Sequence, residues 1–181
     1  MKLLSEKKAI VRLRSLISNF RSEISNFERR AKDCASCEVN GSCCLDAHFV
    51  NVHISRLEAV VINDAIDNMP DIRRRVVRAR IDEAIARYAL TSDGNTFDQT
   101  YSCPLFERGI GCLVHNVGKP TACIAHACYE NAGDMPPNEL ESNVERAIDG
   151  LNDRVYGRTH RWLSIPLALT RYRTRRRMLY R

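Results

Sequence analysis

Eight cysteines in two groups constrain the fold of this 181-residue chain more than any other feature. The first group is Cys34, Cys37, Cys43 and Cys44, and the second is Cys103, Cys112, Cys123 and Cys128. A stretch of 58 residues without cysteine separates the two groups. Thiols concentrated in this way bind metal or form disulfides, so we expect a fold organised around a coordinate or covalent centre.

The rest of the sequence favours metal ligation over disulfides. No apolar run approaches the ~20 residues needed to cross a bilayer. The first residues are interrupted by charges and contain no hydrophobic stretch of the signal-peptide type. We therefore expect a cytoplasmic protein in a reducing environment, where disulfides are rare. The even cysteine count also suits a disulfide framework, and that alternative stays open.

Outside the cysteine groups, apolar spacing predicts a mostly α-helical protein. Residues 3–32 carry apolar side chains at heptad spacing, which predicts one amphipathic helix. Its seam must be buried on the protein's own helices, which we favour, or on a partner protein. The seam residues expected to be buried are Ile10, Leu13, Ile17, Phe20, Ile24 and Phe27.

Further helices are predicted from their start and stop signals. Ser55 and Glu58 have the spacing of a capping box, and Pro70 suits the start of a second helix. The apolar positions of that second helix are Ile72, Val76, Val77, Ile81, Ala84, Ile85 and Tyr88. Another helix is expected from Pro136-Pro137 to Gly157, and the stretch 162–180 has helical character. Only residues 49–54 resemble a strand.

Two stretches, 33–53 and 91–134, lack a regular pattern and contain all eight cysteines. Both are long for structureless loops in a compact domain, and metal ligands would order them. The predicted fold is therefore a small helical bundle with long irregular cysteine-rich loops around a metal or iron–sulfur centre. It would comprise an N-terminal amphipathic helix (1–33), a cysteine-cluster metal-binding domain (34–157) and a basic C-terminal extension (158–181).

The cysteine spacings are typical of metal ligands. Cys34 and Cys37 form a C-x2-C pair, a spacing that lets two thiolates converge on one ion. Cys43 and Cys44 are adjacent, so their side chains diverge, and one of them would serve a second metal, a cluster iron or only packing. The Cys-Pro step at Cys103 resembles one found at iron–sulfur ligands.

Two C-x2-H pairs complete the pattern, Cys112 with His115 and Cys123 with His126, and Cys128 follows closely. A histidine beside metal ligands often orients a ligand without binding the metal itself. Whether His115 or His126 is a ligand therefore stays open.

In this order the motifs resemble the YkgJ-type cysteine-cluster family, described as a zinc- or iron-chelating domain. The matching elements are Cys43-Cys44 after Gly41, Cys103-Pro104-Leu105, Gly111-Cys112-Leu113-Val114-His115, and Lys119-Pro120-Thr121-Ala122-Cys123. The chain departs from the family in a C-x5-C-C spacing after Cys37, in Lys119 where arginine is usual, and in the additional Cys128. The resemblance covers about residues 34–128 and implies metal binding.

The nature of the metal follows from the donor set. Thiolates suit both zinc and iron–sulfur clusters. The adjacent cysteines and the Cys-Pro step favour an iron–sulfur cluster, with zinc as the alternative. All eight cysteines are candidate ligands, enough for two four-thiolate sites or for one site with spectators.

Motifs of common enzyme classes are missing from the sequence. There is no G-x-S-x-G, P-loop or G-x-G-x-x-G, and the C-x2-H pairs lack the context of zinc deaminases. We therefore assign no catalytic residue. The leading hypothesis is a structural or electron- or iron-handling module. The alternatives are a cluster-dependent enzyme, such as the flagellin lysine methylases with similar cysteine patterns, and a nucleic-acid or assembly factor with structural zinc.

The net charge of +6 is unevenly distributed, with nine Arg and no acid in residues 154–181. The densest part contains Arg171, Arg173, Arg175, Arg176, Arg177 and Arg181. This end of the chain is either a solvated tail or a contact for an anionic partner, namely nucleic acid, an acidic protein or a lipid surface.

Overall fold

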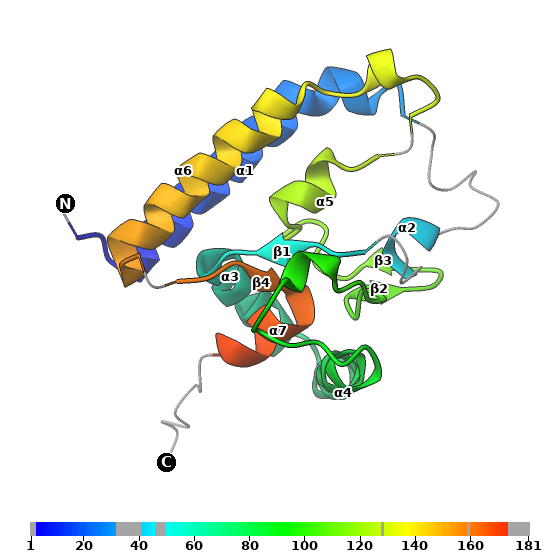
Figure 1. Cartoon of the computed structure of the whole chain (residues 1–181), viewed down its shortest axis with the longest axis vertical. Coiled ribbons are helices and arrows are strands. Elements are labelled where there is room, and N and C mark those ends of the chain that lie inside the picture. Colours follow the sequence, from blue (N-terminus) through cyan, green and yellow to red (C-terminus); the bar gives the residue numbers. More distant parts are fainter. Residues whose placement is uncertain (1–2, 32–40, 46–49, 128, 159, 174–181) are drawn as a thin grey trace.

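A computed structural model describes residues 3–31, 41–45, 50–127, 129–158 and 160–173. These residues are mostly helical, as predicted, with two short antiparallel ladders (Figure 1). The helices are α1 (Glu6–Glu28), α2 (Ser42–Leu45), α3 (Arg56–Asp67), α4 (Asp71–Arg87), α5 (Thr121–Ala125), α6 (Asn138–Tyr156) and α7 (Ile165–Arg171). The strands are β1 (His53–Ile54), β2 (Phe106–Glu107), β3 (Gly111–Cys112) and β4 (Leu163–Ser164).

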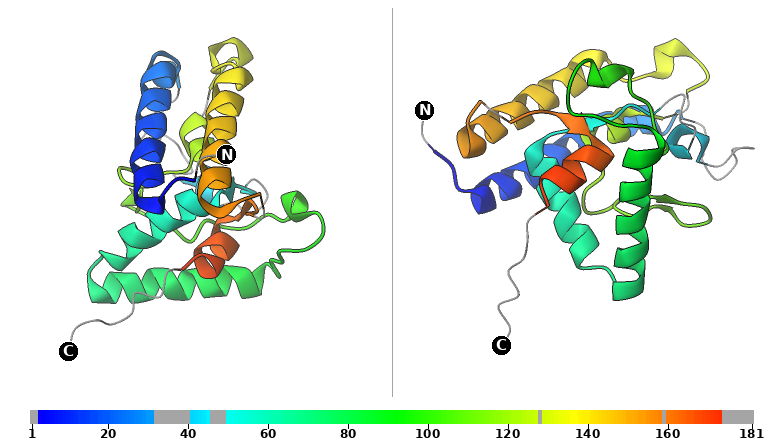
Figure 2. Two further views of the ribbon diagram at one scale, coloured as in Figure 1. Left: turned by 90° about the vertical axis from the view of Figure 1, so that its left-hand side faces the viewer. Right: turned by 60° about the horizontal axis from the view of Figure 1, so that its bottom comes forward.

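Helices α1 and α6 lie side by side and antiparallel along one edge of the molecule (Figures 1 and 2). The predicted seam of α1 is buried within the chain at Leu13, Phe20 and Ile24. The other three predicted seam residues, Ile10, Ile17 and Phe27, are partly buried and pack against the same core. Where α1 begins and α6 ends, the backbone N–H of Leu4 donates to the carbonyl of Arg154 over 3.0 Å. The seam is thus covered largely by the protein's own helices.

Helix α3 joins the two cores of the fold. Leu57 and Val61 pack with α1 and α6, whereas Ile62 and Ile66 pack with α4 and α7. The predicted capping box at its start is confirmed, because the Ser55 side chain accepts from the Glu58 backbone and the Glu58 side chain accepts from the Ser55 backbone.

A second buried polar group also serves the start of α3. The side-chain oxygen of Asn152, on α6, accepts from the backbone N–H of Leu57 over 3.0 Å, and its amide donates to the carbonyl of Ile148. Asn152 therefore satisfies an N–H in the first turn of α3, which has no partner within the helix itself.

The second core is closed by α4, α7 and the β1–β4 ladder, in which His53 pairs with Ser164 and Ile54 with Leu163. The helix predicted to begin after Pro70 is confirmed as α4. Within the stretch 162–180, α7 occupies Ile165–Arg171, and residues 174–181, with four of the six clustered arginines, lie outside the described residues.

Neither irregular stretch is free of secondary structure. The first contains α2 and β1, and the second contains the β2–β3 hairpin, α5 and short 3₁₀ turns. Across the described ranges, we find no helix with the length and apolar character needed to cross a membrane.

Candidate metal centre

Five cysteines from both groups line one cavity of about 730 Å³. They are Cys43 and Cys44 on α2, Cys103 before the hairpin, Cys112 on β3 and Cys123 on α5. We call this space the cysteine cavity. The prediction that the two groups meet in space is confirmed for these five residues, each of which is half-buried with a free thiol. Cys34, Cys37 and Cys128 lie outside the described residues.

The first two cysteines are positioned by a tight turn at Gly41. Gly41 has φ +81°, and α2 begins at the next residue. Its carbonyl accepts from the backbone N–H groups of Cys44 and Leu45, each over 2.9 Å. An added Cβ at Gly41 would lie 2.2 Å from Cζ of Phe106, so the hairpin packs directly on this turn. Adjacent Cys43 and Cys44 both line the cavity.

Replacing Gly41 with alanine should therefore destabilise the protein for two reasons. The left-handed backbone conformation costs roughly 1–2 kcal/mol for a residue with a Cβ, and displacing Phe106 adds roughly 1–3 kcal/mol. Gly94→Ala is the matched control, because Gly94 has φ +75° but nothing within 4 Å of the added Cβ. Urea unfolding should show the larger loss for Gly41→Ala. Equal losses would mean that the contact with Phe106 contributes nothing.

Cys103 is held in place by a series of bonds that joins residues 101–103 to residues 44–52. The backbone N–H of Tyr101 donates to the carbonyl of Val50 over 2.9 Å. The hydroxyl of Ser102 donates to the carbonyl of Leu45, and the N–H of Cys103 donates to the carbonyl of Cys44 over 2.7 Å. These bonds bring the second cysteine group to the first.

Tyr101 anchors this series in the second core. The Tyr101 side chain is fully buried, its hydroxyl donates to the carbonyl of Val52, and it accepts from the N–H of Ile165 over 3.1 Å. The loop that carries Cys103 is thereby fixed to the start of α7, far from it in sequence.

The remaining described cysteines come from the hairpin and from α5. Cys112 pairs with Phe106 in the β2–β3 ladder. Cys123 lies on α5, whose first residue, Thr121, donates its backbone N–H to the Glu58 carboxylate over 3.3 Å. The Glu58 carboxylate is buried and also accepts from the backbone N–H of Ser55. It therefore links the start of α3 to the start of the helix that carries Cys123.

Glu58 should also make stability depend on pH. Burial raises its pKa above the ordinary value of 4.5, so above that pH the folded state keeps a proton that the unfolded state releases. Because the folded state binds more protons, the free energy of unfolding should fall as pH rises through this window, by at most about 1.4 kcal/mol per pH unit. Glu58→Gln should lack this decrease, and replacement of the exposed Glu23 should keep it. Urea titrations from pH 4.5 upward measure the difference, and parallel curves for wild type and Glu58→Gln would contradict it.

The thiols affect one another's ionisation. Burial, with a smaller contribution from neighbouring thiolates, raises the pKa of Cys103 to about 12 and the pKa of Cys123 well above its ordinary value. Burial, followed by the proximity of Cys103 and Cys43, likewise raises the pKa of Cys44. Without a cation these groups are therefore neutral thiols at physiological pH.

Two cationic side chains act on the same thiols in the opposite direction. Lys119 lines the cavity, and its charge lowers the pKa of Cys112 and of Cys123, although burial outweighs it in both cases. Arg21, on α1, has a similar effect on Cys112 and donates to the carbonyl of His115 over 2.6 Å. Positive charge next to the thiols favours their anionic form.

The two histidines of the C-x2-H pairs also line the cavity. Burial, reinforced by Lys119 and Arg21, lowers the pKa of His115, which keeps its imidazole neutral. A neutral imidazole is the form that binds metal or shuttles protons.

The donor set suits a zinc or iron–sulfur centre, since thiolates are the ligands that both prefer. Among the side chains that the structure describes, no three from His, Cys, Asp and Glu are arranged to hold a metal ion. No sequence pattern predicted the contact between Phe106 and Gly41, the bond from Arg21 to His115, or the bond between Glu58 and Thr121. These contacts join residues at least 63 positions apart, beyond the reach of local motifs.

Comparison with known proteins gave no relative: the chain matches no family model, no curated protein and no solved structure.

Proposed function

We propose that this protein binds an iron–sulfur cluster through its cysteines and serves as an electron- or iron-handling module. The observation that carries the proposal is the gathering of five free thiols from four separate segments around one cavity. All five belong to motifs that resemble the YkgJ-type cysteine-cluster family, for which metal binding is expected.

The chemistry of the cavity supports a cationic occupant. Thiols that are buried next to one another resist ionisation, and a bound metal stabilises the thiolate form. A bound cluster would supply a reversible one-electron centre or deliverable iron. Cys43, Cys44, Cys103, Cys112 and Cys123 would hold it, with Cys34, Cys37 and Cys128 as further candidate ligands.

The residues around the thiols have supporting roles. Lys119 and Arg21 would balance the negative charge of several thiolates, because both already favour the anionic form of Cys112. Phe20, Val50 and Leu105 line the same cavity and exclude water from part of it. Such an apolar surrounding strengthens the electrostatic effect of the two cations.

Metal content and visible absorption of anaerobically purified protein test the proposal. A brown protein that contains iron and acid-labile sulfide supports it. A colourless protein that contains stoichiometric zinc overturns the iron–sulfur assignment and favours a structural zinc site in a nucleic-acid or assembly factor. A protein that binds neither, and in which the eight cysteines titrate as free thiols or disulfides, overturns metal binding altogether.

A cluster-dependent enzyme is the second candidate, favoured by the size of the cavity. A volume of about 730 Å³ lies within the range of small-molecule sites and exceeds what the thiols alone need. His126, Tyr129 and Glu141 also line it. For the lysine methylase alternative, equilibrium dialysis of the cluster-loaded protein against S-adenosylmethionine is the direct test. Saturable binding would favour the enzyme, and its absence would favour the electron- or iron-handling module.

A further inference from the structure

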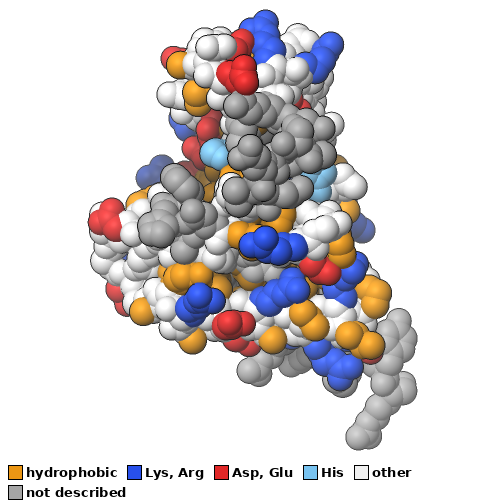
Figure 3. Space-filling view, turned by 90° about the vertical axis from the view of Figure 1, so that its right-hand side faces the viewer, with side chains coloured by type: hydrophobic (Ala, Val, Ile, Leu, Met, Phe, Trp, Pro, Cys, Tyr) orange, Lys and Arg blue, Asp and Glu red, His pale blue; other side chains and the backbone are white. Residues whose placement is uncertain are grey.

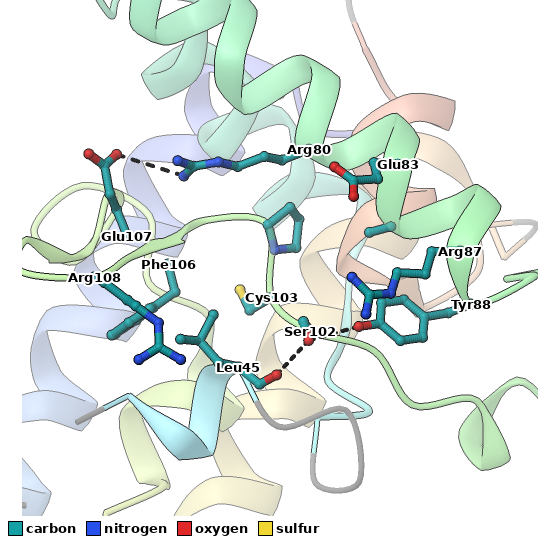
Figure 4. Close-up of a pocket in the computed structure, with 12 residues that line it drawn as sticks. Leu45, Arg80, Glu83, Arg87, Tyr88, Ser102, Cys103, Phe106, Glu107 and Arg108 are labelled. Carbon is teal, nitrogen blue, oxygen red and sulfur yellow. Dashed lines mark hydrogen bonds and ion pairs between the residues drawn. The ribbon is translucent and has the colours of Figure 1, made fainter. Parts of the chain in front are cut away.

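A second cavity, of about 420 Å³, lies between α4 and the hairpin. Figure 4 shows Arg80 extending from α4 toward Glu107, Arg87 beside Tyr88 farther along α4, and Arg108 on the hairpin side, with Cys103 and Ser102 between Arg87 and Arg108. We call this cavity the arginine cavity. Cys103 and Phe106 line both cavities and form part of the wall between them.

Positive charge exceeds negative charge in the arginine cavity. Three arginines line it, against the two acids Glu83 and Glu107. Glu107 is further shared with Arg73, from which it lies 3.9 Å, while Arg80 lies 3.7 Å away. Figure 3 shows several Lys and Arg side chains among hydrophobic ones on the lower half of the face that looks to the right in Figure 1.

One guanidinium nitrogen that lines the cavity finds no acceptor among the described residues. Nη1 of Arg80 is buried, and its distance of 3.7 Å to Oε2 of Glu107 is too long for a hydrogen bond. Buried polar groups are almost always satisfied by protein, water or a ligand. An acceptor oxygen of a ligand in the cavity would satisfy this nitrogen.

The neutral donors of the cavity are already in use. The hydroxyl of Ser102 donates to the carbonyl of Leu45, so the hydroxyl of Tyr88, 2.8 Å from Ser102 Oγ, donates to that oxygen. Among the described residues, Arg87 and Arg108 form no ion pair, and Arg87 lies against the Tyr88 ring with its guanidinium carbon 5.6 Å from the centroid. Recognition in this cavity would therefore come from guanidinium groups.

We propose that the arginine cavity binds a phosphate group, either as free phosphate or as part of a phosphorylated small molecule. Guanidinium groups bind phosphate with paired, charge-assisted hydrogen bonds. Three of them lining one cavity from two elements suit a tetrahedral group with several oxygens and up to two negative charges. A carboxylate offers only two oxygens and one charge. The proposal rests on the arginines alone and does not depend on metal binding.

Isothermal titration of the full-length protein with inorganic phosphate, at constant low ionic strength, tests the proposal. We expect saturable binding at one site. Arg80→Gln and Arg108→Gln should each weaken it about tenfold or more, because each removes charge-assisted hydrogen bonds. Arg75→Gln is the matched control, since Arg75 is exposed on the same helix and does not line the cavity. It should bind phosphate like the wild type.

Further titrations identify the source of the phosphate group. Tighter binding of glycerol phosphate than of inorganic phosphate would indicate a phosphorylated metabolite, and the reverse would indicate free phosphate. Equal binding of acetate, equal loss in Arg75→Gln, or no binding of phosphate would overturn the proposal. Binding of an oligonucleotide by a protein that binds neither inorganic phosphate nor glycerol phosphate would also overturn the proposal and indicate a nucleic-acid surface. Arg87→Gln, at an exposed residue, provides a variant whose folding is least at risk.

Discussion

If the cysteines bind a metal as proposed, replacing Cys103 with serine should remove most of that metal and the stability that it confers. Cys103 lies centrally among the described thiols, next to Cys44 by a backbone hydrogen bond and in electrostatic contact with Cys43 and Cys112. A ligand bound only by the folded state at 100–1,000 times its Kd adds ~2.7–4.1 kcal/mol to the free energy of unfolding. We expect a loss of this size, measured by urea unfolding together with metal analysis.

Tyr88→Phe is the control for this variant. It removes the hydroxyl that donates to Ser102, immediately before Cys103, but leaves every cysteine in place. It should keep full metal content. After chelation, wild type and Cys103→Ser should unfold at similar urea concentrations, because the difference between them is the metal. Full metal content in Cys103→Ser would contradict the assignment of Cys103 as a ligand.

Shortening Leu13 to alanine should cost about 2–5 kcal/mol of unfolding free energy, the usual range for a buried leucine. Only 1% of the Leu13 side chain is exposed, in the core shared by α1, α3, α5 and α6. Val11→Ala, on the same helix at 60% exposure, should change stability by less than about 0.5 kcal/mol. Chemical unfolding measures both values.

Sedimentation separates this interpretation from an intermolecular seam. If α1 packs on α6 of the same chain, dilution should leave the sedimentation coefficient unchanged and Leu13→Ala should act on stability alone. If the seam instead joined two chains, Leu13→Ala would dissociate a dimer, and the measured stability would depend on protein concentration.

Helices with explicit end signals were predicted well from the sequence. The capping box of Ser55 and Glu58, Pro70 before α4, and Gly157 at φ +75° after α6 each mark an observed helix end. These signals are local, because a cap satisfies the first or last backbone groups of the helix with neighbouring residues.

Burial on α4 was predicted less well, because it depends on partners that no local pattern identifies. Val77, Ile81 and Ala84 are buried as expected from their spacing, but Ile72 is 73% exposed and Val76 is 43% exposed. Only a narrow stripe of α4 meets α3 and α7, and the apolar spacing alone overestimated the width of that stripe.

The candidate site, like the fold, has features that local sequence patterns predict and features that they do not. The clustering of the cysteines in the sequence predicted that the two groups meet, since long loops with too little apolar surface need a common centre to order them. The sequence contained no signal for the bonds that bring them together, such as Ser102 to Leu45, or for the arginine cavity behind Cys103. Those features arise from tertiary packing across more than 50 residues.

The pairing of α1 with α6 has a consequence for synthesis of the chain on the ribosome. More than a hundred residues separate the end of α1 at Glu28 from the start of α6 at Asn138. At roughly 5–20 residues per second, the apolar stripe of α1 lacks its α6 partner for ~5–20 s after it emerges. Apolar surface exposed in this way is open to chaperones and to aggregation. Asn138, Leu140 and Glu141 of α6 line the cysteine cavity together with Phe20 of α1, so the wall of that cavity is complete only when α6 has been made. Delivery of a metal or cluster would then follow translation instead of accompanying it.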